Sequence, residues 1–240
     1  MSTKKRISRE EIARYQELLE GKTAEDIIRW AVDFFGPTRL ALASSLSAED
    51  QVITDMLVSI TPEAKVFTLD TGRLFQETYD VLERTRLKYK INIEVCFPDT
   101  AAVEEMVNEK GPNLFYYSVE NRKQCCSIRK VQPLRKKLSS LDGWICGLRR
   151  EQSVTRSDLQ AIEWDRNNGL LKINPLIHWN EQQVWDYIKK HDVPYNFLHD
   201  RGFPSIGCAP CTRAVKPGED IRSGRWWWEL PEYKECGLHK

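Results

Sequence analysis

Short apolar runs alternate with longer helical patterns between residues 38 and 150, and this alternation constrains the fold more than any other feature of the sequence. The apolar runs lie at residues 39–43, 65–69, 91–95 and 143–147. Segments with helical periodicity separate them. Strands that alternate with helices in this way form a parallel sheet with helices on both faces. The sequence therefore predicts an α/β fold whose ligands bind at the carboxyl ends of the strands.

Other segments complete the predicted architecture. A helix that begins at Thr23, with Asp26 three residues later as a capping box, is expected to end at Gly36-Pro37. A hairpin is expected from residues 161–165 and 170–173. Further helices are expected at residues 51–60, 74–90, 101–109, 119–139 and 180–191. The expected divisions are an N-terminal helical extension at residues 1–37, a nucleotide-binding α/β domain at 38–217, and a mobile C-terminal segment at 218–240.

Charge and hydropathy exclude several classes of protein. The chain has 36 Lys and Arg residues against 35 Asp and Glu, a formal charge of +1, so we expect no extended basic surface for nucleic acid. The mean hydropathy is −0.53, and no apolar run approaches the ~20 residues of a membrane span. The basic start at residues 1–6 leads into polar residues, which argues against a signal peptide. We therefore expect a cytoplasmic protein that binds neither nucleic acid nor membrane.

The only candidate phosphate-binding loop is the serine-rich turn at residues 44–50, after the first predicted strand. The sequence contains neither a G-x-G-x-x-G nor a G-x-x-x-x-G-K-[ST] motif. Serine hydroxyls and free amides at the start of a helix can bind an anion. The alternative interpretation is a simple helix cap made of serines.

Four of the seven cysteines form a metal-site pattern. Cys125 and Cys126 are adjacent near a predicted helix, and Cys208 and Cys211 form a C-x-x-C in a loop rich in Gly and Pro. Zinc and a [4Fe–4S] cluster both accept four cysteines. Neighbouring residues of a helix point about 100° apart, which suits the separate iron corners of a cubane cluster better than one tetrahedral zinc. The remaining pair at strand ends, Cys96 and Cys146, is interpreted as core residues.

The seventh cysteine, Cys236, lies close to the C-terminus between Lys234 and His239. Nearby cations stabilise a thiolate, which is the reactive form of a cysteine. Chain termini are commonly mobile, so such a thiol can serve both an active site and a partner protein. The residues alone leave two interpretations open, a nucleophile or an exposed cysteine without function.

Several basic residues follow predicted strands or lie near the cysteines, in a chain whose net charge is close to zero. They are Arg129, Lys130, Arg149, Arg150, Arg156, Arg222 and Arg225. This grouping indicates a compact dianionic ligand bound by guanidinium groups. The three tryptophans at residues 226–228 are expected to anchor their segment by packing, not to stack on nucleic acid.

Taken together, these stretches resemble the assimilatory adenylyl-sulfate (APS) reductases of the phosphosulfate reductase family. The matching stretches are residues 125–134, 147–153, 204–212, 224–229 and 235–239, and the resemblance runs from about residue 38 to the C-terminus. It implies a parallel-sheet adenine nucleotide alpha hydrolase-like (PP-loop) fold with a C-terminal iron–sulfur and tail segment. The modified pyrophosphate loop of that fold matches residues 44–50, which contain no glycine.

The resemblance also implies a complete site. Ser44, Leu69 and Gly147 would line the adenosine pocket. Lys130, Arg156, Arg222, Arg225 and His239 would surround the phosphosulfate. Cys125, Cys126, Cys208 and Cys211 would hold a [4Fe–4S] cluster, and Cys236 would be the nucleophile.

The activity implied is the reduction of APS to sulfite and AMP through a Cys236 S-sulfonate, with thioredoxin or glutaredoxin as a separate reductant. An alternative within the family is a cluster-containing reductase of the 3′-phosphorylated substrate (PAPS), or one of dual specificity. Two alternatives lie outside this activity: a zinc-stapled nucleotide-binding or tRNA-modifying protein with an incidental Cys236, and a non-enzymatic nucleotide sensor. The sequence leaves the oligomeric state open, a homo-oligomer included.

Overall fold

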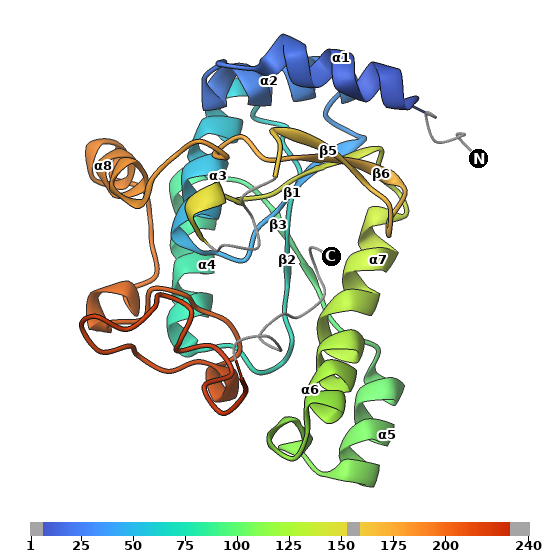
Figure 1. Ribbon diagram of the computed structural model, residues 1–240, viewed down its shortest axis with the longest axis vertical. Coiled ribbons are helices and arrows are strands. Elements are labelled where there is room, and N and C mark those ends of the chain that lie inside the picture. The colour runs from blue at the N-terminus through green and yellow to red at the C-terminus, as the bar shows by residue number, and fades with distance from the viewer. Residues whose placement is uncertain (1–6, 153–158, 231–240) are drawn as a thin grey trace. The chain divides into compact units, whose positions relative to one another are not determined.

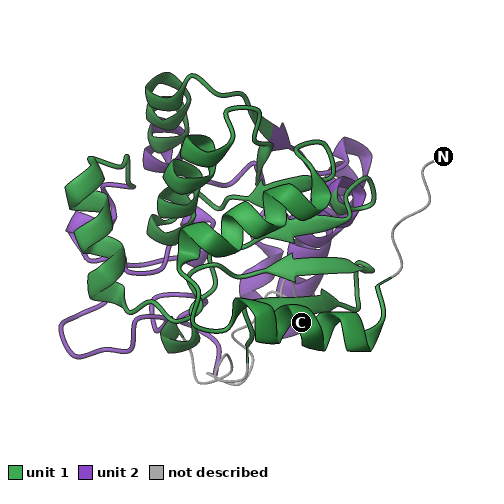
Figure 2. Cartoon of the chain, turned by 90° about the horizontal axis from the view of Figure 1, so that it is seen from above, with its two compact units in different colours: residues 1–68, 81–94, 138–195 green, residues 69–80, 95–137, 196–240 purple. Residues whose placement is uncertain are grey.

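The computed structural model describes residues 7–152 and 159–230. The chain divides into two discontinuous units, coloured separately in Figure 2. Unit 1 comprises residues 1–68, 81–94 and 138–195, and unit 2 comprises residues 69–80, 95–137 and 196–240. The domain limits expected near residues 37 and 217 stay a prediction.

The four predicted apolar runs form strands, and the expected hairpin forms two more (Figure 1). The strands are β1 (Leu40–Ala43), β2 (Val66–Leu69), β3 (Ile93–Cys96), β4 (Gly143–Ile145), β5 (Ile162–Asp165) and β6 (Leu170–Ile173). In the described part of the chain they form one sheet in the order β3-β2-β1-β4-β6-β5. The predicted α/β fold is thereby confirmed.

Strand pairing determines which loops meet at one edge of the sheet. The central strand β1 pairs in parallel with β2 and with β4, so that Leu42 lies opposite both Val66 and Ile145. β6 continues the parallel arrangement beside β4, and only β5 is antiparallel. Because β1 and β4 are parallel neighbours, Ser44 and Gly147, which follow them closely, lie at the same edge of the sheet.

Helices connect and cover these strands. They are α1 (Arg9–Leu19), α2 (Ala24–Phe35), α3 (Ala48–Ile60), α4 (Gln76–Tyr89), α5 (Thr100–Lys110), α6 (Val119–Cys126), α7 (Gln132–Leu138) and α8 (Glu181–His191). The predicted capping box of α2 is present, with Thr23 accepting from the Asp26 amide at 3.1 Å. No helix within residues 7–152 and 159–230 is long and apolar enough to cross a membrane.

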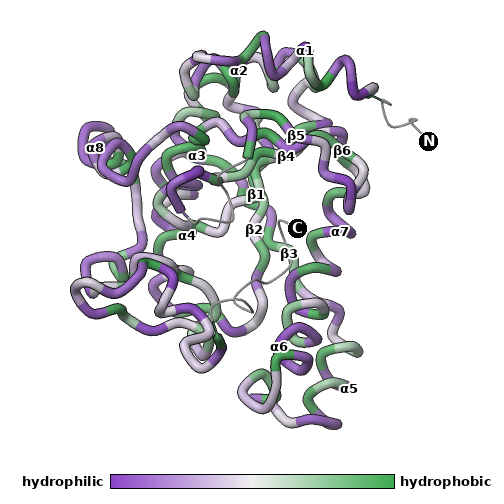
Figure 3. Tube along the Cα trace, in the orientation of Figure 1, coloured by the Kyte–Doolittle hydropathy of each residue, from purple (hydrophilic) through white to green (hydrophobic). Residues whose placement is uncertain are grey.

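The core of unit 1 lies between the sheet and the helices α2 and α3, both of which contact β1. Leu42, Ile53 and Ile145 are completely buried there, as the apolar strands of Figure 3 suggest. The first two helices belong to the same core, because Leu19 and Ile28 are buried within it. The N-terminal helices therefore share the core of the sheet.

Unit 2 has a smaller core, built from α5, α6 and the C-terminal segment. Its buried residues are Met106, Leu114, Phe115, Cys126, Cys211 and Trp226. The single helix predicted over residues 119–139 is wrong in one respect, because a π-helical turn at Ser127–Val131 separates α6 from α7. This turn follows the cysteine pair directly, and such wide turns often occur at functional sites.

Candidate functional site

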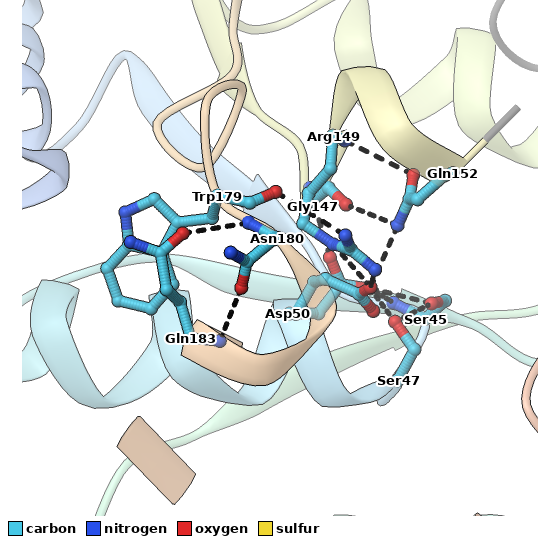
Figure 4. A network of polar contacts seen from close by, with 10 residues as sticks. Ser45, Ser47, Asp50, Gly147, Arg149, Gln152, Trp179, Asn180 and Gln183 are labelled. Atoms are coloured by element: carbon cyan, nitrogen blue, oxygen red, sulfur yellow. Dashed lines mark hydrogen bonds and ion pairs between the residues drawn. The ribbon is translucent and has the colours of Figure 1, made fainter. Parts of the chain in front are cut away.

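The serine-rich loop after β1 is organised around one buried carboxylate, that of Asp50 (Figure 4). Its Oδ2 accepts hydrogen bonds from the Ser45 amide at 2.7 Å, the Ser45 hydroxyl at 2.6 Å and the Ser47 hydroxyl at 3.2 Å. Its Oδ1 accepts from the Gly147 amide at 3.1 Å. The carboxylate thus ties the loop after β1 to the loop after β4.

The pKa of Asp50 is raised to about 6, because burial and, to a smaller extent, the neighbouring Glu49 charge outweigh the hydrogen bonds from Ser45 and Ser47, which lower it. The Ser47 hydroxyl faces this carboxylate and makes no cap bond to helix α3. The serines therefore serve the Asp50 network and are more than a helix cap. The backbone of the loop is also restricted between these two serines, because Leu46 is buried at a left-handed φ of 62°.

A second set of contacts joins the start of α3 to the segment after β4. The Glu49 carboxylate pairs with the guanidinium of Arg149 at 2.9 Å and accepts from the Gln152 amide group at 2.9 Å. The Arg149 charge, which sequence analysis grouped with the anion-binding residues, is therefore matched by a carboxylate inside unit 1. Both side chains are largely buried, so this pair fixes the loop that contains Gly147.

Two of the residues expected at the adenosine pocket lie in this region. Ser44 is buried just after β1, and its hydroxyl accepts from the Leu46 amide at 3.1 Å. Gly147 has no room for a side chain, because a Cβ atom would collide with the Asp50 carboxylate. Leu69, the third, is the last residue of β2 and is assigned to unit 2. Their contacts with a nucleotide stay a prediction.

In unit 2, the structure brings together the four cysteines that sequence analysis selected. Cys125, Cys126, Cys208 and Cys211 all line one pocket of about 400 Å³. Among residues 7–152 and 159–230, no group of three or more His, Cys, Asp or Glu side chains is arranged to hold a metal ion. The four thiols border one shared space.

Local backbone geometry explains how the four thiols reach one pocket. Cys125 and Cys126 end α6, whereas Cys208 precedes a 3₁₀ turn that ends at Cys211. The Cys211 amide donates to the Cys208 carbonyl at 2.9 Å, which closes the C-x-x-C turn. Outside the turn, the Trp226 amide donates to the Cys211 carbonyl at 3.1 Å. The turn is therefore fastened to the C-terminal segment.

Basic side chains dominate the remaining walls of this pocket. They are Arg73, Arg122, Arg129, Lys130 and Arg225, and no carboxylate is among the lining residues. Arg129 donates to the Thr71 carbonyl at 2.6 Å, and Arg73 to the Pro112 carbonyl at 2.7 Å. Because these acceptors are uncharged, their positive charge is not cancelled by those bonds. The pocket therefore suits a negatively charged occupant.

Arg122, another residue of this pocket, has a carboxylate partner. It is completely buried and forms a bidentate ion pair with Glu229, with N–O distances of 2.9 and 2.7 Å. Its guanidinium also lies 4.8 Å from the ring centroid of Trp226, and that of Arg225 lies 4.7 Å from the same centroid. The ion pair joins α6, which carries two cysteines, to the last described residues of the chain.

The environment affects each thiol differently. Burial raises the pKa of Cys211 to about 12 and also raises the pKa of Cys125. Burial opposes ionisation of Cys208 as well, but the charge of Lys130 and a 3.3 Å contact with the Thr71 hydroxyl bring its pKa below the ordinary value. Thiolates are the ligand form of cysteine, and the lowered pKa makes Cys208 easier to ionise than an ordinary cysteine.

The other predicted site residues are placed as follows. Lys130 and Arg225 line the cysteine pocket, and Arg222 is half-buried in the same unit. Arg156, Cys236 and His239 lie outside the described residues, so the roles expected of them stay predictions. Cys146 is buried in unit 1, as expected of a core residue, and Cys96 is half-buried.

Sequence reasoning missed some residues that shape both parts of the site. The buried Arg122 had a detectable signal, because it precedes Cys126 by four positions and so shares its helix face. Glu49 and Arg73 had none, since their partners are distant in the sequence or are backbone carbonyls.

Comparisons with known proteins agree on one family. A family model described as the phosphoadenosine phosphosulfate reductase domain matches residues 39–214. A protein of Allochromatium vinosum named adenosine 5′-phosphosulfate reductase is 51% identical over 201 residues, which cover 84% of this chain and 78% of that protein. A protein of the same name from Burkholderia cepacia is 52% identical over 201 residues, 84% of this chain and 80% of that protein.

A solved structure extends the agreement to the fold. The crystal structure of phosphoadenylyl-sulfate (PAPS) reductase from Candida auris, a phosphate complex, superimposes with a TM-score of 0.76 at 28% identity. The match covers 89% of this chain and all of the other. The PP-loop-like nucleotide-binding fold that the sequence motifs implied is therefore confirmed, and the C-terminal iron–sulfur segment stays a prediction.

The Asp50 network predicts an unusual response to substitution. Both carboxylate oxygens accept from a backbone amide, so the NH₂ group of an Asp50→Asn variant faces an N–H donor in either orientation. We expect a loss of about 1–3 kcal/mol in the free energy of unfolding at pH 7, measured by urea denaturation. The exposed Asp33→Asn in α2 is the control and should be nearly neutral.

The difference in the free energy of unfolding between the wild type and the Asp50→Asn variant should depend on pH. Because the pKa of Asp50 is raised to about 6, the native wild type binds a proton more readily than the unfolded chain between about pH 4 and pH 6. Its stability therefore gains a contribution as the pH falls through this range, and the Asn variant lacks it. A difference between the two proteins that shrinks towards pH 4 would contradict this account.

The Arg122–Glu229 pair predicts a large cost for removing one partner. A Glu229→Gln variant leaves a buried guanidinium without its countercharge, and we expect a loss of about 3–5 kcal/mol in the free energy of unfolding. The control is Glu77→Gln, which breaks the exposed pair with Arg201 and should cost at most about 1 kcal/mol. Equal costs for the two variants in denaturant titrations would refute the assignment of Glu229 as a buried anchor.

Proposed function

The chain belongs to the phosphoadenosine phosphosulfate reductase family, and from that premise we propose that it reduces adenosine 5′-phosphosulfate (APS) to sulfite and AMP. The observation that carries the proposal is the gathering of Cys125, Cys126, Cys208 and Cys211 around one basic pocket. Relatives of about half-identical sequence bear the name of this activity. The reductant is a separate thioredoxin or glutaredoxin, and the enzyme works in the cytoplasm, where such thiols are kept reduced.

The reaction begins at the thiolate of Cys236. This sulfur attacks the sulfate sulfur of APS, a new S–S bond forms, and the bond between that sulfur and the bridging phosphate oxygen breaks. AMP leaves with the electron pair of the broken bond. The product on the chain is a Cys236 S-sulfonate.

The second half of the reaction supplies the electrons. A carrier thiolate attacks the Sγ of Cys236, and sulfite leaves with the electron pair of the broken S–S bond. The second thiol of the carrier then resolves the mixed disulfide, which returns the Cys236 thiolate and leaves the carrier oxidised. Two electrons therefore pass from the carrier dithiol to the substrate sulfur.

Basic side chains lower the barrier of the first step. A thiolate and a sulfate repel each other, so cations that neutralise the substrate and the leaving phosphate stabilise the transition state. We assign this task to Lys130, Arg222 and Arg225 in unit 2, together with Arg156 and His239. Ser44, Leu69 and Gly147 line the adenosine pocket, and the Asp50 bond to the Gly147 amide holds that backbone in place.

The four pocket cysteines fit a [4Fe–4S] cluster. Four thiolates on a cubane core form a dianion, and the pocket provides cationic walls without a carboxylate. Cys125 and Cys126 are neighbours at the end of α6, and neighbouring helical residues point about 100° apart, which suits the separate iron corners of a cubane better than one zinc. When bound, the cluster would supply fixed negative charge that orients Lys130 and would join the C-x-x-C turn to α6.

APS is the substrate we favour, and PAPS is the second candidate. The four-cysteine set accompanies APS use in the family that the sequence resembles, and the relatives from Allochromatium vinosum and Burkholderia cepacia are named for APS. PAPS is the second candidate because the PAPS reductase of Candida auris shares the fold at 28% identity.

A Cys236→Ser variant tests the covalent route. Exposure of the wild type to APS without reductant should add one sulfite-sized mass to the peptide that contains Cys236, and PAPS should give less adduct. The variant should form no adduct and should lose at least about a thousandfold in turnover, because a serine hydroxyl is a far weaker nucleophile. Cys96→Ser is the matched control and should keep both activities; sulfite release by Cys236→Ser at the wild-type rate would exclude the mechanism.

The cluster has its own test. Protein purified without oxygen should be brown and should contain iron and acid-labile sulfide in equal amounts. Cys208→Ser should lose the colour and most of the iron, whereas Cys96→Ser should retain both. A colourless wild type with stoichiometric zinc would instead support a zinc-stapled nucleotide-binding protein.

A further inference from the structure

Unit 2 exposes a group of large apolar side chains close to its basic pocket. Tyr116 is 42% exposed, Tyr117 74%, Trp227 40% and Leu230 61%. We call these four residues, three aromatic ones and Leu230, the aromatic patch. Soluble proteins seldom leave neighbouring large apolar groups in water without a use, and such patches mark interaction surfaces.

Neighbouring rings and one hydrogen bond hold two residues of the patch, Tyr116 and Trp227, in place. The Tyr116 ring lies 6.3 Å from that of Trp227 and 4.5 Å from that of Trp228, centroid to centroid. Its hydroxyl donates to the Pro210 carbonyl at 2.7 Å, within the C-x-x-C turn. Two residues after Trp227, Glu229 forms the buried pair with Arg122. Tyr116 and Trp227 are therefore preorganised, so a partner that contacts them loses little conformational entropy in binding.

The position of the patch in the chain relates it to the proposed nucleophile. Leu230 is the last described residue, and Cys236 follows it by six positions. Six extended residues span at most about 20 Å, so the Sγ of Cys236 lies within roughly that radius of Leu230. A carrier of ~100 residues has a radius of gyration of about 13 Å. A carrier whose thiol reaches Cys236 is therefore large enough to contact surface close to Leu230 at the same time.

We propose that the aromatic patch is the docking surface for the protein dithiol that reduces the Cys236 S-sulfonate. This inference rests on the proposed function and adds the place where the partner binds. A dithiol carrier that attacks a sulfur on another protein has to present its own reactive thiol from an exposed surface, and the flat aromatic groups offer it a rigid apolar contact. Tyrosine and tryptophan are also the residues that most often carry binding energy at interfaces.

The two half-reactions allow a direct test. The variant is Tyr117→Ser with Trp227→Ser, which leaves Tyr116 and the buried rings in place. In the first measurement, variant and wild type are exposed to APS without reductant, and AMP release and adduct mass are followed. In the second, reduced thioredoxin is added below saturation to the isolated S-sulfonate form, and sulfite release is timed. In the third, a small dithiol replaces thioredoxin.

We expect the first and third rates to stay within about twofold of wild type, and the thioredoxin-dependent rate to fall at least about tenfold. The matched control is Leu87→Ser in α4, because Leu87 is 68% exposed but belongs to unit 1; it should leave all three rates unchanged. If the double variant does not fold, Tyr117→Ser alone is compared with the wild type in the same three measurements, because Tyr117 is the most exposed residue of the patch.

Several results would overturn the proposal, and each is distinct. An unchanged thioredoxin-dependent rate would show that the carrier docks elsewhere. An equal loss in all three rates would assign the patch to substrate or tail binding. A change from dimer to monomer in the variant, seen by light scattering, would show that a second copy covers the patch. Failure of the wild type to form any adduct would instead refute the proposed function itself.

Discussion

Charge balance around the four cysteines is the constraint on which unit 2 depends. The chain as a whole carries a formal charge of only +1, yet among the described residues that line this pocket five are basic and none is a carboxylate. Buried like charges are costly, and the Glu229 carboxylate matches one of them, that of Arg122. An anionic occupant lowers that cost. The same local excess of positive charge is what the attack of a thiolate on a sulfate requires.

Backbone geometry determines where this charge is placed. The cysteine pair ends α6 just before a π-helical turn, and the second pair closes a 3₁₀ turn. Arg129 and Lys130 lie within the wider π turn itself, and both line the pocket that the cysteines line. A continuous α-helix would direct those side chains differently. The irregularity is thus a condition for bringing ligands and cations to one place.

The sequence allowed much of the fold to be predicted, because the relevant signals are local. The apolar runs identified β1 to β4, and Thr23 with Asp26 identified the start of α2. The π turn was missed because its residues carry no pattern that differs from a helix. The partners of Arg149 and Arg122 were missed because they lie about a hundred residues away. Non-local pairs depend on the tertiary fold, which composition and periodicity do not describe.

The two proposed half-reactions place opposite demands on the same sulfur. The first needs Cys236 among cations, because substrate and nucleophile are both anions. The second needs Cys236 within reach of a protein surface, where apolar contact supplies the binding energy. Unit 2 offers both kinds of environment: a basic pocket lined by Arg225, and exposed aromatic rings at Trp227, two residues later. The Arg122–Glu229 pair immobilises this short segment against α6. It therefore keeps both environments in place within unit 2, a few residues before the thiol that must use both.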